Sequence, residues 1–326
     1  MNSNNPFMTS KVTKHENSKD RNVSPVNRQG FLTSMKRFSE KKPAIIKSPA
    51  KINLILNVVS KRKDGYHNLE TIMVPVSLWD EMEISSTNRK QIKIICDNKE
   101  LPVDNGNIIN KAVKLLWDTT GWEEGVLVKL KKNIPISSGL GGGSSNGAST
   151  LIALNKIWKT GFSRTELMRL GLKLGADVPF FIYGKPALAK GIGEKIYPIK
   201  IKRDFWLILV NPGFPVSTAW VYKNLNLALT KKTKNNNELL SLLKKGKSPD
   251  LWSKYLLNDL ENVTLRKFPV LTEIKNAIME NGALNVLMSG SGPSVFGVFA
   301  SRNKALTAYN ALKDREFGSV FLVKNL

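Results

Sequence analysis

The sequence of 326 residues has little of the chemistry that binds metals or forms disulfides. Its single cysteine, Cys96, excludes an intrachain disulfide, a cysteine-ligated zinc cluster and a Cys-x-x-Cys redox pair. Its two histidines, His15 and His67, exclude a histidine-rich metal site. No apolar run approaches the roughly 18 residues that suggest a membrane-spanning helix. These absences favour a globular protein in a reducing compartment, and the length predicts about two domains.

Positive charge dominates the composition, with 50 lysines and arginines against 26 acidic residues and a formal net charge of +24. Nucleic-acid binding would require basic residues clustered on one face with aromatic residues between them. The basic runs, such as the one at 129–132, are short and scattered. We therefore favour a compositional bias spread over the surface, with attraction of an anionic substrate as a further use of the charge.

Residues 1–43 differ from the rest of the chain. They are rich in Asn, Ser and Lys, carry nine basic and three acidic residues, and have almost no apolar periodicity. This composition predicts a disordered basic extension. The segment lacks the apolar stretch of a secretory signal, whereas its basic, serine-containing composition leaves a plastid-type transit peptide open. We expect a cytoplasmic protein unless the extension is such a targeting peptide.

From Ala44 onward, apolar periodicity predicts short strands that alternate with helices. This order favours an α+β architecture with helices on one face of a sheet. A lysine-rich stretch at 200–203 predicts a boundary between an N-terminal domain, 44–202, and a C-terminal domain, 203–326. The expected strands are 44–60, 69–76, 81–84, 91–96, 126–130, 205–210, 284–288, 295–300 and 319–323, and the expected helices are 107–117, 145–158, 165–174, 237–243, 271–280 and 305–312.

The glycine-rich segment from Pro135 to Ser145 is the most informative motif. Its glycines let the backbone adopt positive φ and approach a ligand closely. The helix expected to follow would present unpaired N–H groups and partial positive charge at its start. A flexible linker would be polar on both sides, whereas a strand and an apolar helix flank this loop. The pattern favours a phosphate-binding loop, although it matches neither a Walker A motif nor a dinucleotide fingerprint.

Polar residues in two apolar segments are candidates for catalysis. Lys51 and Asn53 lie two positions apart on a predicted strand, so their side chains share a face. A functional pair and a solvent-exposed lysine on an edge strand both fit this pattern. Asp177 lies among apolar residues, either as a helix-capping aspartate or as a functional carboxylate. If Lys51 and Asp177 lie close together, Asp177 can accept a hydroxyl proton while Lys51 stabilises negative charge.

Two turn sequences complete the set of motifs. Residues 288–294 join two expected strands and contain three serines and two glycines, which favours a second wall of an anion site over a plain hairpin. Asp64 and Gly65 predict another hairpin. The adjacent Tyr66 and His67 are able to stack on and hydrogen-bond to a base, although a lone histidine in a turn is more often simply exposed.

In this order, the segments at 48–54, 64–67, 139–146 and 175–179 resemble the GHMP kinase superfamily. Within it they resemble the branch that phosphorylates the 2-hydroxyl of a cytidylyl diphosphate derivative of methylerythritol, in the non-mevalonate isoprenoid pathway. The resemblance runs from about residue 46 to the C-terminus. It implies an N-terminal domain like domain 2 of ribosomal protein S5, a ferredoxin-like C-terminal domain, and a site between them.

The resemblance also implies roles for individual residues. Asp177 would be the general base and Lys51 its electrostatic partner, while His67 would recognise a cytosine held between Tyr66 and Tyr222. Magnesium is expected with ATP, and its ligands are unassigned apart from Ser144 as a candidate. The residues expected to bind the substrate are Asn53, Tyr66, His67, Thr218 and Tyr222. The residues expected to bind the ATP phosphates are Pro135, Ile136, Ser137, Ser138, Gly139, Leu140, Gly141, Gly142, Gly143, Ser144 and Ser145.

The expected partners are therefore ATP and a small cytidylyl diphosphate substrate, without nucleic acid or membrane, for a monomer or homodimer. One alternative is another GHMP kinase that acts on mevalonate, phosphomevalonate or homoserine, for which a cytosine pocket would have no use. A second alternative is a basic nucleic-acid-binding protein, which predicts salt-sensitive RNA binding and no ATP turnover.

Overall fold

Two β-sheets organise the chain in the computed structural model, which describes residues 42–227 and 236–326. The predicted extension at 1–43 lies almost entirely outside the described residues. The first sheet contains β1 (Ala44–Lys61), β2 (His67–Thr87), β3 (Ile92–Cys96), β4 (Gly125–Lys131), β5 (Ala187–Gly191), β6 (Lys195–Pro198) and β8 (Leu257–Asn258). The second sheet contains β7 (Trp206–Asn211), β9 (Asn285–Met288), β10 (Val295–Phe299) and β11 (Ser319–Lys324).

The two strands predicted at 69–76 and 81–84 form one continuous strand, β2, so the prediction of a break between them was wrong. The register of β2 against β1 shifts where Pro49 pairs with Trp79 and Ala50 pairs with Val76. The residues between the predicted strands therefore form an irregularity within the ladder rather than a turn. Hydrophobic periodicity is interrupted equally by a bulge and by a turn, which explains the error.

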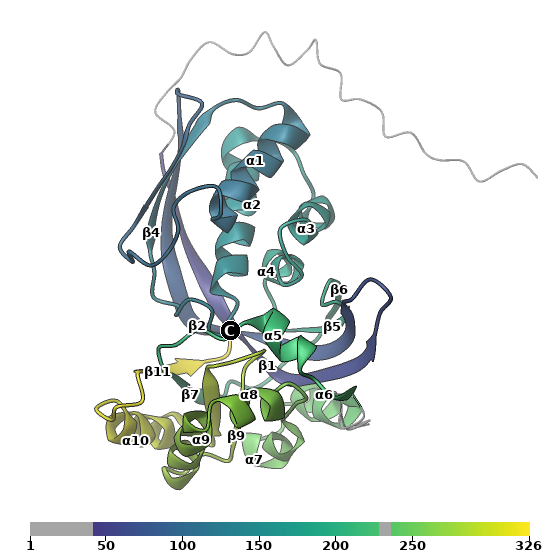
Figure 1. Ribbon diagram of the computed structural model, residues 1–326, viewed down its shortest axis with the longest axis vertical. Helices are drawn as coiled ribbons and strands as arrows, with labels where there is room; N and C mark the ends of the chain where they lie inside the picture. The colour runs from purple at the N-terminus through teal and green to yellow at the C-terminus, as the bar shows by residue number, and fades with distance from the viewer. Residues whose placement is uncertain (1–41, 228–235) are drawn as a thin grey trace, which may run out of the picture. The chain divides into compact units, whose positions relative to one another are not determined.

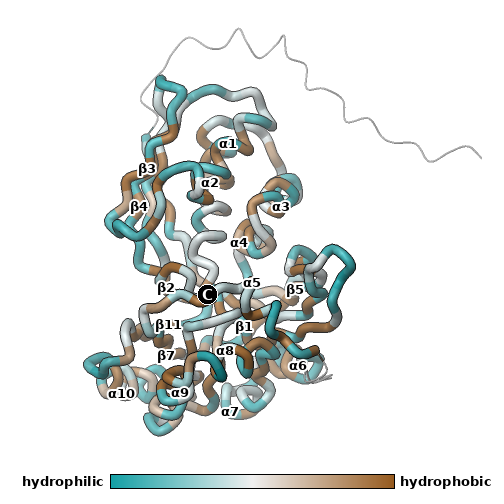
Figure 2. Tube along the Cα trace, viewed as in Figure 1, coloured by the Kyte–Doolittle hydropathy of each residue, from teal (hydrophilic) through white to brown (hydrophobic). Residues whose placement is uncertain are grey.

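Four helices lie on one face of the first sheet: α1 (Ile108–Thr120), α2 (Gly142–Trp158), α3 (Arg164–Leu172) and α4 (Val178–Tyr183) (Figure 1). The side chains of Leu116, Leu151 and Val128 belong to the apolar core between these helices and the sheet. In Figure 2, the helices and strands carry both hydrophobic and hydrophilic residues, and several of the outer loops are hydrophilic. The prediction of helices on one face of a sheet is confirmed for this part of the chain.

Helix α2 begins at Gly142, three residues earlier than the predicted start at Ser145. Glycine adds nothing to apolar periodicity and has low helix propensity, so the pattern could not place the first turn. The position is closely packed, because a Cβ on Gly142 would lie 2.9 Å from Cγ2 of Ile134. The first turn of α2 is therefore part of the glycine-rich segment itself.

The second sheet packs against two helices on one face, and on the other against the first sheet and two further helices. Helices α9 (Val270–Glu280) and α10 (Arg302–Leu312) pack with its strands in one apolar cluster. A second cluster joins Ile52 of β1 to Leu207 of β7 and Phe296 of β10. The remaining helices of the described chain are α5 (Thr218–Lys223), α6 (Asn236–Lys245), α7 (Pro249–Trp252), a short 3₁₀ helix (Ser253–Tyr255) and α8 (Glu261–Lys267).

The chain passes from the first sheet to the second between β6 and β7, close to the predicted boundary at 202–203. Strand β8 nevertheless returns to pair in parallel with β1, so the first sheet includes residues from both halves of the chain. The division into domains 44–202 and 203–326 stays a prediction. Among the described residues, no helix is long and apolar enough to cross a membrane.

Candidate active site

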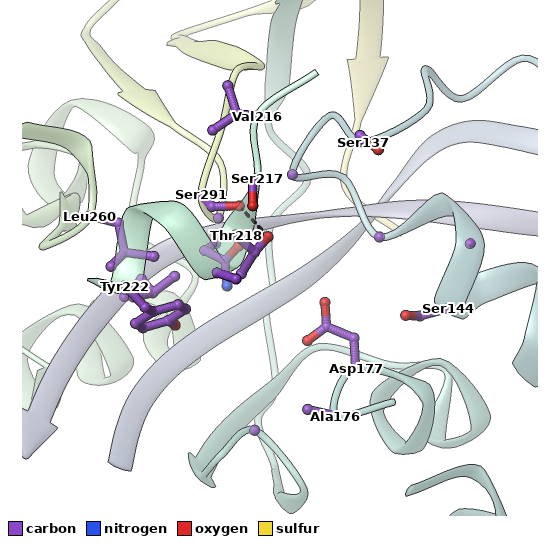
Figure 3. Close-up of a pocket in the computed structure, with 18 of the residues that line it drawn as sticks. Ser137, Ser144, Ala176, Asp177, Val216, Ser217, Thr218, Tyr222, Leu260 and Ser291 are labelled. Carbon is purple, nitrogen blue, oxygen red and sulfur yellow. Dashed lines mark hydrogen bonds between the residues drawn. The ribbon is translucent and has the colours of Figure 1, made fainter. Parts of the chain in front are cut away.

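A cavity of about 1200 Å³ lies where the start of α2, the residues before α4, helix α5 and the β9–β10 turn meet. Figure 3 shows Ser144, Asp177, Thr218 and Ser291 projecting from these different segments around the cavity. The structure brings together every residue that the sequence predicted for the site except Leu140 and Ser145. Those two side chains are fully buried and do not line the cavity.

The glycine loop takes a shape that side chains would prevent. Gly139 has φ of +78°, and a Cβ there would lie 2.1 Å from the Ser289 carbonyl oxygen. Gly141 has φ of +72°, and its Cβ would collide with the Phe181 ring. Gly143 has nothing within 4 Å of the position of a Cβ. The main chain therefore packs tightly on one side of the loop and remains open where Gly143 faces the cavity.

The first turn of α2 has the features of an anion site. Its N-cap residue, Gly141, provides no side-chain hydrogen bond to cap the helix. The first intrahelical bond runs from the Ser145 N–H to the Gly141 carbonyl, 2.9 Å, so the N–H groups before it have no partner within the helix. With the partial positive charge of a helix start, these groups suit phosphate oxygens.

Backbone contacts fix this loop between the two sheets. The Lys51 N–H donates to the Leu140 carbonyl at 2.9 Å, which ties the loop to β1. The Ser289 hydroxyl donates to the Gly139 carbonyl at 3.1 Å, which ties it to the β9–β10 turn. Gly290 and Ser291 of that turn line the cavity. The turn at 288–294 therefore forms a second wall of the cavity, and its contact with an anion stays a prediction.

Lys51 and Asp177 meet inside the cavity. Lys51 Nζ lies 3.7 Å from Asp177 Oδ2 and donates a hydrogen bond of 2.7 Å to Asn53 Oδ1. The Lys51 side chain is 5% exposed and that of Asp177 is 35% exposed, which excludes the interpretation of Lys51 as a solvent-exposed edge lysine. Asp177 immediately precedes α4, but its side chain makes no capping hydrogen bond, so the carboxylate remains available to the cavity (Figure 3).

Aromatic residues line another part of the cavity. The rings of His67 and Tyr222 stack with centroids 5.0 Å apart and planes 22° apart. His67 is buried, so the interpretation of an exposed turn histidine was wrong. Tyr66 lines the same cavity but is 60% exposed. The structure thus brings His67 and Tyr222 together at the predicted base pocket, while the sandwich of a cytosine between Tyr66 and Tyr222 stays a prediction.

Local electrostatics set the protonation of these two rings. Burial lowers the pKa of His67, and the nearby positive charge of Lys61 lowers it further. Burial raises the pKa of the Tyr222 phenol, and the negative charge of Asp177 adds to the increase. At neutral pH the imidazole is therefore uncharged, with one donor and one acceptor nitrogen, and the phenol remains protonated.

Helix α5 and the β9–β10 turn are joined across the cavity. The hydroxyl oxygens of Thr218 and Ser291 lie 2.7 Å apart in a hydrogen bond, drawn as a dashed line in Figure 3. Ser217 caps the same short helix by accepting from the Trp220 N–H. The predicted substrate residues Thr218 and Tyr222 therefore share one helical turn that is anchored to the opposite wall.

Sequence reasoning missed a buried ion pair beneath the loop. Lys132 Nζ lies 2.8 Å from Asp80 Oδ2, with the two side chains 3% and 0% exposed. The Asp80 carboxylate also accepts from the backbone N–H groups of Asn133 and Ile134 and from the Asn146 amide. Lys132 belongs to a basic run that looked like solvent-facing charge, and no feature of the sequence separated it from its neighbours. Asp80 links the end of β4 to the first turns of α2.

Thr71 is a second cavity residue that the sequence did not single out. It lies on β2, is 3% exposed, and contacts the Asn53 amide through its hydroxyl. A threonine in a strand is ordinary, because its branched side chain suits the pleated surface. Only its position beside Asn53 distinguishes it.

Protein ligands for a metal are few in this part of the chain. Among the residues that the structure describes, no group of three or more His, Cys, Asp or Glu side chains could hold a metal ion. The cavity does place the Asp177 carboxylate and the Ser144 hydroxyl near the glycine-rich loop. This sparse set of oxygen donors fits a magnesium ion bound largely by phosphates and water.

Comparison with known proteins identifies clear relatives. The family model described as GHMP kinases N terminal domain matches residues 107–185, and the one described as GHMP kinases C terminal matches residues 239–317. A 4-diphosphocytidyl-2-C-methyl-D-erythritol kinase of Syntrophus aciditrophicus (strain SB) is 45% identical over 281 residues, which cover 86% of this chain and 99% of the relative. An enzyme of the same name from Pelobacter propionicus is 44% identical over 267 residues, which cover 82% of this chain and 93% of the relative.

A solved structure agrees with these sequence relatives. The crystal structure of a 4-(cytidine 5'-diphospho)-2C-methyl-D-erythritol kinase matches the described fold with a TM-score of 0.74 at 32% identity. The match covers 86% of this chain and 99% of the other. The similarity therefore extends through both sheets and the cavity between the segments described above.

Proposed function

This chain belongs to the 4-diphosphocytidyl-2-C-methyl-D-erythritol kinase family of GHMP kinases, and on that premise we propose how its residues perform the reaction. The protein is an ATP-dependent small-molecule kinase with an alcohol group as acceptor. It phosphorylates the 2-hydroxyl of 4-diphosphocytidyl-2-C-methyl-D-erythritol and gives the 2-phosphate and ADP, a step of the non-mevalonate isoprenoid pathway. The expected GHMP kinase architecture is confirmed.

One observation carries the assignment of roles. Lys51 and Asp177 lie 3.7 Å apart in the same cavity that the glycine-lined start of α2 enters. Phosphoryl transfer to an alcohol needs positioning and charge stabilisation more than covalent chemistry. A backbone phosphate site, one carboxylate and one ammonium group are sufficient parts for such a transfer.

Each part has a defined task in the proposed mechanism. The backbone of residues 139–144 binds the ATP phosphates, and Asp177 accepts the proton of the substrate's 2-hydroxyl. Lys51 stabilises the negative charge that spreads over the transferred group. The stacked His67 and Tyr222, with Tyr66 at the cavity edge, bind the cytosine. Asn53 and Thr218 contact the rest of the substrate.

We propose that Mg²⁺ accompanies ATP. The phosphates and water would provide most of its ligands, and the Ser144 hydroxyl at the start of α2 is the candidate ligand from the chain. The ion would offset phosphate charge. Among the described residues, no group of three or more His, Cys, Asp or Glu side chains could hold a metal ion, which supports a metal that arrives with the nucleotide.

The remaining expectations are also proposals. We propose a cytoplasmic monomer or homodimer that does not act on nucleic acid, with domains at 44–202 and 203–326. The alternatives that act on mevalonate, phosphomevalonate or homoserine are not favoured, because the relatives at 44–45% identity carry the name of the cytidylyl enzyme. The positive net charge of +24 supports attraction of two polyanions, ATP and a diphosphate substrate.

A coupled ADP-release assay tests the proposed function. The purified full chain receives ATP and Mg²⁺ with the cytidylyl methylerythritol substrate, mevalonate or homoserine in parallel reactions. We expect turnover with the cytidylyl substrate alone, and a new phosphomonoester signal in the ³¹P NMR spectrum of its product. Turnover with mevalonate or homoserine that exceeds turnover with the cytidylyl substrate would contradict the assignment.

A further inference from the structure

We propose that Thr71 is a positioning residue for phosphoryl transfer, because its hydroxyl fixes the Asn53 amide in the orientation that presents oxygen to the Lys51 ammonium group. The inference rests on the proposed function, in which Lys51 and Asp177 act on the transferred group. Thr71 itself has no role in the chemistry. It acts through Asn53 on the position of Lys51.

Three consecutive hydrogen bonds carry the proposal. The Thr71 hydroxyl donates to the Ile55 carbonyl at 2.6 Å, and the Asn53 amide nitrogen donates to the Thr71 hydroxyl oxygen at 2.8 Å. The Lys51 ammonium then donates to Asn53 Oδ1 at 2.7 Å. This series of hydrogen bonds ends at the Lys51 ammonium group, which lies 3.7 Å from the Asp177 carboxylate.

The direction of these bonds is fixed from the Thr71 end. A hydroxyl has one proton, and Thr71 gives that proton to Ile55. Towards Asn53 it is therefore an acceptor, so Asn53 must direct its NH₂ group to Thr71 and its oxygen to Lys51. The opposite amide orientation would direct an NH₂ group at an ammonium group and an oxygen at a hydroxyl without a free proton.

A β-bulge brings these groups together. Asn53 pairs with Met73 and Ile55 with Ile72, so β1 carries one more residue than β2 at Leu54. The two partners of the Thr71 hydroxyl, Asn53 and Ile55, stand on either side of that additional residue. The irregularity therefore places one threonine within reach of both a backbone carbonyl and the amide next to Lys51.

Burial makes the arrangement specific. Although they line the cavity, Thr71, Asn53 and Lys51 are at most 4% exposed as whole residues, so water has little access to replace a missing partner. A buried ammonium group requires acceptors at defined positions. Asn53 Oδ1 provides one, and the Asp177 carboxylate lies at 3.7 Å. An amide that can rotate would leave Lys51 without a fixed acceptor and move its charge relative to the phosphoryl group.

The first experiment compares Thr71→Val and Thr71→Ser with the unmodified chain. Valine keeps the branched shape and removes the hydroxyl, so we expect kcat to fall about tenfold while KM for ATP stays within twofold. Serine keeps the hydroxyl and should recover most of kcat. The matched control is Thr150→Val, since Thr150 is equally buried but its hydroxyl donates to the Asn146 carbonyl within α2. This control should retain kcat within twofold.

The second experiment repeats Thr71→Val in an Asn53→Ala background. If Thr71 acts through Asn53, the second substitution should lower kcat by less than twofold there, because the amide that it orients is absent. A tenfold loss in that background would overturn the inference, as would a single Thr71→Val variant with unchanged kcat. If the valine variant does not fold, Thr71→Ala is used with the same expectations.

The same measurements separate this inference from the proposed function. An unmodified chain without kinase activity on the cytidylyl substrate contradicts the proposed function. An active unmodified chain whose Thr71→Val variant is equally active contradicts only the role of Thr71.

Discussion

The Lys51 ammonium lies 3.7 Å from the Asp177 carboxylate, a separation longer than a direct hydrogen bond. Lys51 comes from the middle of β1, and Asp177 precedes α4. The two charges are close enough to attract each other, while the carboxylate oxygens stay available to a substrate hydroxyl. This geometry suits a base that must accept a proton beside a cation that stabilises the transferred charge.

Asp177→Asn tests the base. The amide has nearly the same shape but cannot accept the hydroxyl proton, so we expect kcat to fall by about 10²-fold or more. Binding of ATP should remain nearly unchanged, because the proposed mechanism assigns the phosphates to the backbone of another loop. Steady-state kinetics and calorimetric titration with an ATP analogue measure the two effects. Near-normal turnover would remove Asp177 from the proposed role.

Gly139 and Gly143 test the shape of the loop. At Gly139, a methyl group would meet the Ser289 carbonyl at a positive φ, so we expect Gly139→Ala to destabilise the protein by about 1–3 kcal/mol. Gly143→Ala is the matched control, because its Cβ has open space and alanine favours the helix by about 1 kcal/mol. Thermal unfolding measures both variants. Equal Tm values would contradict the packed geometry of Gly139.

His67→Ala tests the base pocket. We expect the KM for the cytidylyl substrate to rise far more than the KM for ATP, because His67 stacks on Tyr222 at the proposed cytosine pocket, whereas the glycine-rich loop is the proposed site of the ATP phosphates. Initial-rate kinetics with each substrate varied in turn give the two constants. Equal losses for the two substrates would contradict the assignment of His67 to cytosine.

The pH dependence of substrate binding should follow the imidazole of His67. Burial and Lys61 lower its pKa, so the ring is neutral at neutral pH and gains a proton only below the usual pKa of histidine. Binding should be constant above that pKa and weaken as the pH falls through it, because the protonated ring has no acceptor. Lys61→Ala removes one of the two causes of the lowered pKa, so the pKa of His67 should rise and the loss of substrate binding should occur at higher pH. If the pH at which half of the binding is lost does not change in this variant, Lys61 is not a cause of the lowered pKa of His67.

Lys132→Met tests the ion pair beneath the loop. The variant would leave the fully buried Asp80 carboxylate without its cation, and we expect a loss of about 3–5 kcal/mol in the free energy of unfolding. Adding Asp80→Asn should recover part of that loss by removing the unpaired charge. Denaturant unfolding of the single and double variants measures both changes. A Lys132→Met variant as stable as the original would show that the pair does not stabilise the fold.

The sequence by itself determined the local features of this protein. Period-two patterning placed Lys51 and Asn53 on one face of a strand, and four glycines before an apolar helix indicated the phosphate loop. The shared face of Lys51 and Asn53 is confirmed by the hydrogen bond between their side chains, because it depends on neighbouring residues alone, and phosphate binding by the loop stays a prediction. The sequence did not predict the start of α2 at Gly142, because glycine contributes no side chain to the hydrophobic pattern.

The tertiary structure alone decided which distant residues meet. The approach of Lys51 to Asp177, the bond between Thr218 and Ser291, and the burial of Lys132 against Asp80 each join segments far apart in the chain. Thr71 became informative only when the bulge in β1 brought its hydroxyl to Asn53. Such contacts depend on how two sheets and their helices pack together, and that packing is a sum of many weak interactions that no short pattern contains.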